Sequence, residues 1–162
     1  MAEINVFLIF TIQPFTFYCY GSVHVYSLPF YMKECKILIV DDDEDDIGLL
    51  AGAFLQSGVE NLHYVFSAMQ AFIYLESVQH ACLPKLIITD HFLPGMTGTE
   101  FLKDLKAMEK YRHIHVVVLS TIKSPKEIEK HRQMGALDYL NKPCTYEEYR
   151  QVAAEIKRKV GL

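Results

Sequence analysis

This sequence lacks closely spaced cysteines and an excess of positive charge, and each absence argues against a class of protein. The four cysteines, Cys19, Cys35, Cys82 and Cys144, are widely spaced, and no two of them form a Cys-X-X-Cys pair. The wide spacing of the cysteines argues against a disulfide framework or a zinc site and indicates reduced thiols in a cytoplasmic protein. The formal net charge is -4, so the chain as a whole has no electrostatic attraction for nucleic acid. We therefore expect no nucleic acid partner.

Lysine and arginine are absent from residues 1–31, a stretch that is rich in Phe, Tyr, Ile and Val. A secretory signal would need a basic start and a small-residue cleavage site. A membrane helix would need about 20 apolar residues in a row, whereas Gln13, Pro14 and Pro29 are among the residues that interrupt this stretch. We expect residues 1–31 to be an apolar N-terminal extension without function, or the product of a misassigned start, and residues 32–162 to form the functional domain. Membrane tethering through residues 1–31 is the alternative.

The length and composition fit one globular domain. The chain has 162 residues, of which 51% are hydrophobic and 22% charged, a balance that can fill a core and differs from that of disordered chains. From Lys36 onward, short apolar runs alternate with amphipathic stretches. The runs that we expect to form strands lie at residues 37–40, 62–66, 86–90, 116–119 and 136–140.

Helical spacing fills the segments between these strands. Ile47, Leu50, Ala51, Phe54 and Leu55 recur at i, i+3, i+4, i+7 and i+8, which predicts one buried helix face. Similar patterns predict helices near residues 68–75, 101–105 and 146–160. A further helix is predicted from its ends, because Ser124, Pro125 and Glu127 form a helix-start signal and Gly135 would end the helix. Five strands that alternate with five helices predict an α/β fold with a doubly wound, five-stranded parallel sheet. In such sheets, ligands bind beyond the carboxyl ends of the strands.

An acidic run, DDDEDD at residues 41–46, follows the first of these strands. Crowded carboxylates repel one another unless a cation neutralises them, and Asp90 adds a further carboxylate at the end of the third strand. An all-oxygen site of this kind suits Mg²⁺. Acidic runs are also common on solvated surfaces. We therefore expect the members at residues 43–46 to be surface charges or charges at the start of a helix.

A lysine and a hydroxyl group follow two other strands of the predicted sheet. Ser120 ends the fourth strand, and Lys142 comes directly after the fifth. A lysine near carboxylates can neutralise the charge that develops on a transferred phosphoryl group, and a carboxylate can act as the nucleophile. Metal, lysine, hydroxyl and carboxylate together suffice for phosphoryl transfer, which depends mainly on positioning and charge stabilisation.

Four segments in register resemble one known family. KILIVDDDEDD, LIITDHFLPGMTG, VVVLS and GALDYLNKP occur in an order and at spacings similar to those of response regulator receiver domains from two-component signal transduction. The resemblance covers about residues 36–162. It implies the flavodoxin-like, three-layer (βα)5 receiver fold and a function as the phosphoacceptor of a phosphorelay.

The resemblance also implies which residues carry out the chemistry. Asp90 would accept the phosphoryl group. Asp41 and Asp42 would bind Mg²⁺ together with Asp90 and the backbone carbonyl of Phe92. Lys142 would pair with Asp90 and afterwards with the phosphoryl oxygens.

Two further residues would take part in signalling by the same resemblance. Ser120 would hydrogen-bond the phosphoryl group, and Tyr139 would be the switch aromatic that turns inward when Ser120 is drawn towards the phosphate. Since tyrosine is common in strands, Tyr139 could instead be an ordinary half-buried strand residue.

We expect the chain to act as a stand-alone signalling protein, because no output module follows the last helix. The phosphodonor would be a histidine kinase or a histidine phosphotransfer protein. The output would go to an unidentified partner protein or to the next step of a relay. The resemblance places the signalling surface at roughly residues 126–159 and allows a homodimer. Such a protein is not an enzyme in the usual sense, since it would catalyse only its own phosphorylation and slow dephosphorylation.

Two other functions are compatible with the same fold. A Mg²⁺-dependent phosphohydrolase with an aspartate nucleophile typically has a second acid two residues after the nucleophile, where this sequence has Phe92. An interaction module that works without phosphorylation would need none of the phosphotransfer residues, whereas each of those positions is occupied here. The sequence therefore favours the phosphoacceptor.

Overall fold

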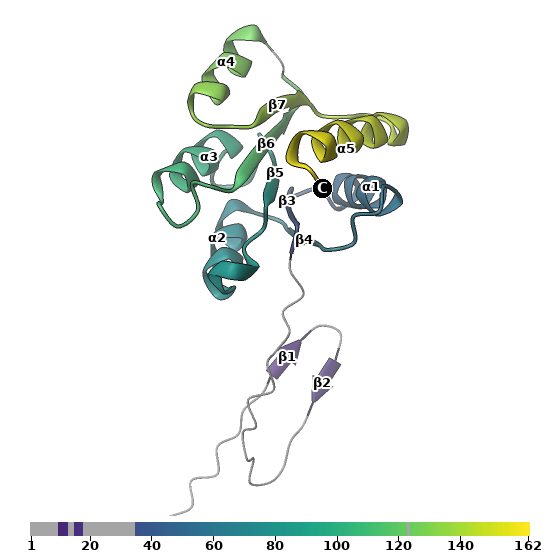
Figure 1. Ribbon diagram of the computed structural model, residues 1–162, viewed down its shortest axis with the longest axis vertical. Helices are drawn as coiled ribbons and strands as arrows, with labels where there is room; N and C mark the ends of the chain where they lie inside the picture. The colour runs from purple at the N-terminus through teal and green to yellow at the C-terminus, as the bar shows by residue number, and fades with distance from the viewer. Residues whose placement is uncertain (1–9, 13–14, 18–34, 123) are drawn as a thin grey trace, which may run out of the picture. The chain divides into compact units, whose positions relative to one another are not determined.

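The protein, seen here as a computed structural model, is described at residues 10–12, 15–17, 35–122 and 124–162 (Figure 1). The chain divides into two units, Met1–Tyr31 and Met32–Leu162. In the first unit, strands β1 (Phe10–Ile12) and β2 (Phe15–Phe17) pair in antiparallel fashion. Most of residues 1–31 lies outside the described part of the chain, so the expectation that this stretch has no function stays a prediction.

The second unit is built on a parallel sheet. Its strands are β3 (Ile37–Val40), β4 (Leu62–Val65), β5 (Leu86–Asp90), β6 (His115–Ser120) and β7 (Asp138–Asn141). They lie in the order β4-β3-β5-β6-β7, and each neighbouring pair is parallel. The strand order therefore reverses between β3 and β5, which is the position where doubly wound sheets bind ligands. The predicted α/β fold is confirmed.

Helices cover both faces of this sheet. They are α1 (Glu44–Gln56), α2 (Ala68–Ser77), α3 (Gly98–Ala107), α4 (Pro125–Gln133) and α5 (Tyr146–Val160), with a short 3-10 helix, η1 (His80–Cys82), before β5. Figure 1 shows α1 and α5 together on one face and α2, α3 and α4 on the other. Among the residues that the structure describes, no helix is both long and apolar enough to cross a membrane.

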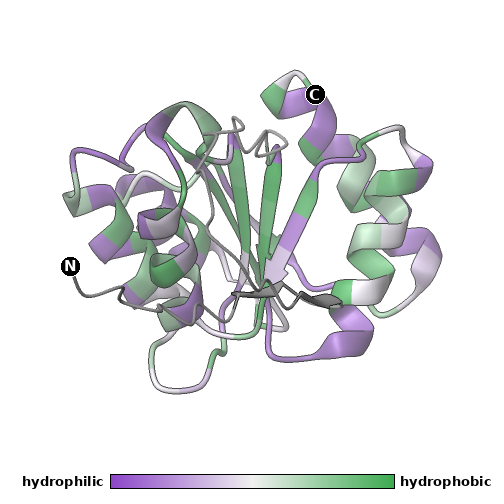
Figure 2. Cartoon of the chain, turned by 90° about the horizontal axis from the view of Figure 1, so that it is seen from below, coloured by the Kyte–Doolittle hydropathy of each residue, from purple (hydrophilic) through white to green (hydrophobic). Residues whose placement is uncertain are grey.

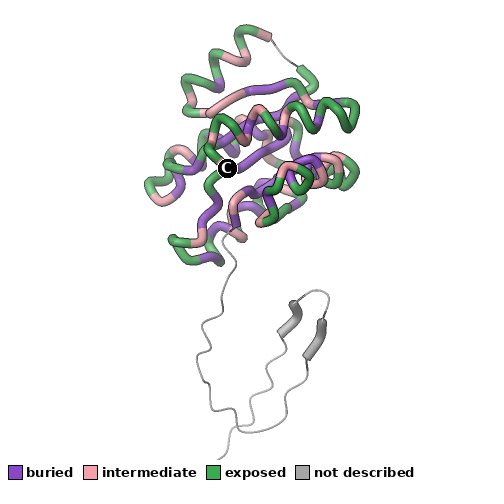
Figure 3. The backbone as a smooth tube through the Cα atoms, turned by 45° about the vertical axis from the view of Figure 1, so that its right-hand side comes forward, coloured by how far each residue is buried: buried purple, intermediate pink, exposed green. Residues whose placement is uncertain are grey.

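Successive side chains along the central strands point to opposite faces of the sheet, so the core is divided into two clusters. On β3, Leu38 and Val40 pack into the cluster under α2 and α3, while Ile37 and Ile39 pack into the cluster under α1 and α5. All four side chains are at most 1% exposed. The central strands are accordingly hydrophobic in Figure 2 and buried in Figure 3. Since each fully buried aliphatic side chain contributes about 1.5–3 kcal/mol, both faces hold the strand ends in fixed positions.

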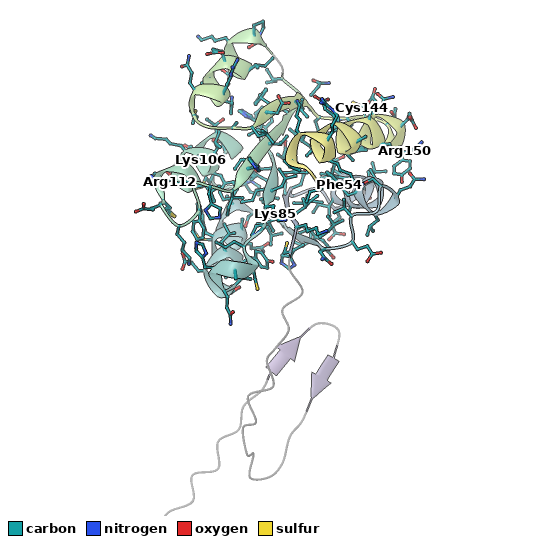
Figure 4. The ribbon with its side chains drawn as sticks, viewed as in Figure 1. Phe54, Lys85, Lys106, Arg112, Cys144 and Arg150 are labelled. Carbon is teal, nitrogen blue, oxygen red and sulfur yellow. The ribbon has the colours of Figure 1, made fainter. Side chains whose placement is uncertain are left out.

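The buried face of α1 differs in part from the prediction. Ile47, Leu50, Ala53 and Phe54 are buried, and Phe54 lies where α1 meets α5 (Figure 4). Leu55, which the sequence pattern placed on this face, is 52% exposed. One residue turns a helix by about 100°, so Leu55 lies past Phe54 and outside the stripe that the sheet and α5 cover.

Side-chain caps determine where the helices begin. The side chains of Asp43, Ser67, Thr97, Ser124 and Thr145 each accept a hydrogen bond from a backbone N–H in the first turn of the helix that follows. A cap of this kind typically stabilises a helix by about 1 kcal/mol. Because Asp43 follows β3 by only three residues, its cap starts α1 next to the carboxyl edge of the sheet.

Candidate functional site

Polar residues from neighbouring strands meet at the carboxyl edge of the sheet. Asp41 follows β3, Asp90 is the last residue of β5, Ser120 is the last residue of β6, and Lys142 follows β7. Because β3 and β6 flank β5, Asp90 lies in the middle of this edge. The structure thus brings together residues that are as far apart in the sequence as Asp41 and Lys142.

Asp41, Asp42 and Asp90 form an acidic cluster at this edge. One carboxylate oxygen from each lies within 4.8 Å of the others. Asp41 and Asp90 are buried, with exposures of 5% and 7%, whereas Asp42 is exposed. Burial raises the pKa of the Asp41 carboxyl above its ordinary value, although hydrogen bonds from Lys142 and from the Asp43 N–H act in the opposite direction. A crowded set of oxygen ligands such as this one fits a hard divalent cation like Mg²⁺.

The ammonium group of Lys142 contacts these carboxylates. Its Nζ lies 2.9 Å from Oδ2 of Asp41 and 3.3 Å from Oδ2 of Asp90. A still shorter distance, 2.6 Å, joins it to Oδ2 of Asp46. Burial alone would lower the pKa of Lys142, but the hydrogen bonds to Asp46 and Asp41 outweigh burial and raise it. Lys142 is therefore a permanent positive charge beside Asp90.

Asp46 has a larger part in the site than its sequence suggests. It does lie in the first turn of α1, as predicted for a helix-start charge, but its side chain also pairs with Lys142 and accepts a hydrogen bond from the Tyr149 hydroxyl. The sequence did contain a signal for this. Asp46 precedes Leu50 by four residues and Ala53 by seven, and both of these are buried on α1, so the helical period places Asp46 on the inner face.

Ser120 and Tyr139 both bind the backbone of Ile122. The Ser120 Oγ accepts a hydrogen bond from the Ile122 N–H at 3.0 Å, and the Tyr139 hydroxyl donates to the Ile122 carbonyl at 2.8 Å. Tyr139 is 2% exposed, so it is an inward-pointing residue and not a half-buried one. Burial raises the pKa of its phenol, which stays protonated and able to donate.

His131, which the sequence reasoning did not select, lies fully buried beside Tyr139. The two ring centroids are 4.3 Å apart. One ring nitrogen, Nδ1, is 2.7 Å from the Glu127 carbonyl oxygen, and the other, Nε2, is 2.8 Å from Oγ1 of Thr99. His131 therefore joins α4 to α3. The sequence of α4 is so polar that its period does not mark which residue faces inward.

Backbone hydrogen bonds hold the loop after Asp90 in place. The His91 N–H donates to Oδ1 of Asp90 at 2.6 Å, and the Gly98 N–H donates to the His91 carbonyl at 2.9 Å. The side chains of Phe92 and Ile122 are exposed and border an open pocket of about 550 Å³. Neither of these side chains can hydrogen-bond a water molecule beside Asp90.

The raised pKa of Asp41 predicts how stability depends on pH. The folded protein holds this proton more tightly than the unfolded chain, whose carboxyl titrates near its ordinary value of 3.8. The stability contributed by this group is complete below the unfolded pKa and is lost as the pH rises through the folded pKa.

The Asp41→Asn variant cannot ionise at this position. Without metal it should therefore be more stable than the wild type at neutral pH, with a smaller difference at acidic pH. Urea unfolding at both pH values measures this, and an Asn variant that is less stable at neutral pH would contradict it.

Comparison with known proteins accounts for this arrangement. The sequence model of the response regulator receiver domain matches residues 37–154, which include the carboxylates, Ser120 and Lys142. The chain belongs to the response regulator receiver family. The fold of this receiver domain agrees with that assignment, because solved receiver domains superpose on it.

The similarity extends over most of this receiver domain and of its relatives. The two-component response regulator ORR6 of Oryza sativa subsp. japonica is 33% identical over 127 residues, which cover 77% of this chain and 72% of that protein. The phosphorylated cyanobacterial phytochrome response regulator RcpA has a TM-score of 0.68 at 29% identity, over 77% of this chain and 92% of that chain. The signal receiver domain of a signal transduction histidine kinase from Syntrophus aciditrophicus has a TM-score of 0.64 at 27% identity, over 78% and 90% of the two chains. The predicted flavodoxin-like receiver fold is confirmed.

Proposed function

We propose that Asp90 accepts a phosphoryl group from a histidine kinase or a histidine phosphotransfer protein. The observation that supports this most is the contact of the Lys142 ammonium group with the carboxylates of both Asp90 and Asp41. It places a positive charge beside a buried carboxylate, where negative charge would develop during phosphoryl transfer. The relative RcpA, whose structure was solved in its phosphorylated form, adds support.

The reaction would proceed by direct displacement at phosphorus. A carboxylate oxygen of Asp90 attacks the phosphorus atom of the donor phosphohistidine, so that a P–O bond forms while the P–N bond breaks. The donor imidazole leaves with the electron pair and takes up a proton, and Asp90 becomes an acyl phosphate. Lys142 would follow the phosphoryl oxygens, and Ser120 would donate a hydrogen bond to one of them.

Mg²⁺ is the cofactor that suits this site. The carboxylates of Asp41, Asp42 and Asp90 would hold it, together with the backbone carbonyl of Phe92. When bound, it would supply positive charge to the phosphoryl oxygens. The raised pKa of Asp41 supports this proposal, because a cation would relieve the cost of keeping that buried carboxylate ionised.

The signal would leave through α4, β7 and α5. If Ser120 turned to a phosphoryl oxygen, its hydrogen bond from Ile122 would weaken. Tyr139, which binds the same backbone residue, would respond together with the start of α4. Tyr139 already points inward, so phosphorylation would stabilise a conformation that the domain can adopt without it.

We further propose that residues 32–162 form the receiver domain and that residues 1–31 take no part in its function. The protein would act in the cytoplasm, where its kinase presents the phosphohistidine, and would signal through a partner protein or a relay without contacting nucleic acid. The surface of α4, β7 and α5 is also where a homodimer would form. Apart from its own phosphorylation and dephosphorylation, it would catalyse no reaction.

Intact-protein mass spectrometry tests the phosphoacceptor directly. Residues 32–162 would be incubated with a small phosphodonor and Mg²⁺, and compared with the Asp90→Asn variant. We expect one added phosphoryl group that requires both Mg²⁺ and Asp90, since asparagine offers no carboxylate nucleophile.

Asp104→Asn is the matched control, because Asp104 is an exposed aspartate on α3 away from the strand ends. This variant should be phosphorylated like the wild type. Phosphorylation that persists in Asp90→Asn would refute the assignment. Sustained turnover of small phosphate esters would instead favour the phosphohydrolase.

A further inference from the structure

The partner that lies closest to Lys142 is Asp46, not the proposed phosphoacceptor. The distances from Nζ to the carboxylate oxygens are 2.6 Å for Asp46, 2.9 Å for Asp41 and 3.3 Å for Asp90. Lys142 therefore interacts with three carboxylates, and the longest of these contacts is the one to Asp90. Whatever holds Asp46 in place also sets how strongly Lys142 interacts with Asp90.

Tyr149 of α5 holds Asp46 in place. Its hydroxyl donates to Oδ1 of Asp46 at 2.6 Å, which leaves Oδ2 facing Lys142. Tyr149 is 1% exposed and belongs to the cluster between the sheet, α1 and α5. Burial and the bond to Asp46 raise the pKa of this phenol, so it remains a hydrogen-bond donor. The chain of contacts thus runs from buried Tyr149 through Asp46 and Lys142 to Asp90.

Lys142 and Mg²⁺ would compete for the same carboxylate oxygens. A lysine whose charge was directed wholly at Asp41 and Asp90 would neutralise the ligands that the metal needs. Asp46, which is not one of the proposed metal ligands, binds Lys142 and so weakens the interaction of the lysine with Asp41 and Asp90. The negative charge of Asp46 also favours a cation nearby. Both effects have the same sign, since each makes Mg²⁺ bind more tightly.

We propose that Asp46, oriented by Tyr149, is a positioning residue that draws Lys142 towards itself and so keeps Asp41 and Asp90 available to Mg²⁺ and to the phosphodonor. The inference rests on the proposed function, but it concerns metal affinity and can be tested without phosphorylation. Asp46 and Tyr149 touch no reacting atom in this scheme, and they act through Lys142.

Calorimetric titration of metal-free protein with Mg²⁺ alone tests the proposal in four variants. Asp46→Asn keeps the shape of the side chain but removes its charge, and should weaken Mg²⁺ binding by about fivefold, the effect of one partly solvated charge. Tyr149→Phe keeps the ring but frees the Asp46 carboxylate to rotate, and should weaken binding by about twofold. If Tyr149 acts through Asp46, adding Tyr149→Phe to Asp46→Asn should weaken binding no further. Asp45→Asn removes the same charge from an exposed neighbour and should change the affinity little.

Two outcomes would overturn the proposal, and a third would support it. Equal affinities for the Asp46→Asn and Asp45→Asn variants would show that Asp46 contributes only general charge. If the loss of Mg²⁺ affinity in the double variant equalled the product of the losses in the two single variants, Tyr149 would act independently of Asp46. Restoration of wild-type affinity by Asp46→Glu, which can reach Lys142 again, would support it.

The proposed function and this inference can fail separately. If Mg²⁺ affinity falls as expected but the wild type is never phosphorylated on Asp90, the positioning role stands and the phosphoacceptor does not. If the wild type is phosphorylated but Asp46→Asn binds Mg²⁺ as tightly as Asp45→Asn, the positioning role is refuted and the phosphoacceptor stands.

Discussion

Replacing Gly98 with alanine should destabilise the protein by about 3 kcal/mol, the upper range for overpacking a tight site. A Cβ atom at this position would lie 2.2 Å from the carbonyl oxygen of Asp90 and 3.1 Å from the Cα of His91. These are backbone atoms of the proposed phosphoacceptor and of the residue that follows it, and they cannot rotate away. The loop or the start of α3 would have to move, and the hydrogen bond from the Gly98 N–H to His91 would weaken.

Gly48→Ala is the matched control for this substitution. Gly48 lies within α1, and a Cβ atom there would meet nothing within 4 Å. Alanine is the better helix former by about 1 kcal/mol, so this variant should be slightly more stable than the wild type. Urea unfolding of the three proteins measures the difference. A Gly98→Ala protein as stable as the Gly48→Ala protein would mean that the close approach to Asp90 is not a constraint.

Replacing Lys142 with methionine should lower the rate of phosphorylation and the metal-free stability but raise the affinity for Mg²⁺. Phosphorylation of Asp90 by a small phosphodonor should slow by about 100-fold, the usual cost of removing one group that stabilises transition-state charge. Metal-free stability at neutral pH should fall by about 3 kcal/mol, since the buried carboxylates of Asp41 and Asp90 would lose their cation. Mg²⁺ should nevertheless bind more tightly, because its competitor for these oxygens is gone.

Lys110→Met is the control for this variant. Lys110 forms a surface ion pair with Glu76, and its side chain is 40% exposed, so solvent screens the interaction and little stability should be lost. Phosphorylation and Mg²⁺ affinity should stay at wild-type values. If Lys142→Met weakened Mg²⁺ binding, the lysine would be supporting the metal site and not competing with it.

The sheet and the strand-end residues are the parts that could be predicted from sequence. Apolar runs marked the strands, and parallel strands bring their carboxyl ends to one edge, so Asp41, Asp90 and Lys142 were expected to meet. The contact between Asp46 and Tyr149 could not be predicted in this way, because it depends on how closely α1 and α5 pack against each other on one face of the sheet. Tertiary packing also decided that Leu55 is exposed, which its position in the helical period did not reveal.

His131 shows a second limit of sequence reasoning. Polar side chains dominate α4, so hydrophobic spacing gave no inner face, and a buried histidine looks like a surface one. Its burial depends on partners from two elements, the Thr99 hydroxyl and a carbonyl of its own helix. Hydrogen bonds of this kind offset the cost of burying a polar ring, but they exist only once α3 and α4 are in place.

Lys142 lies far along the sequence from the carboxylates that it contacts, and this separation has a consequence for synthesis of the protein. Its carboxylate partners at positions 41, 46 and 90 leave the ribosome well before β7, which carries Lys142 into the site. During translation the acidic residues are therefore without their lysine, and Asp90 lacks the charge that would stabilise a transferred phosphoryl group. A nascent or truncated chain that ends before β7 should consequently compete poorly with complete molecules for phosphoryl groups.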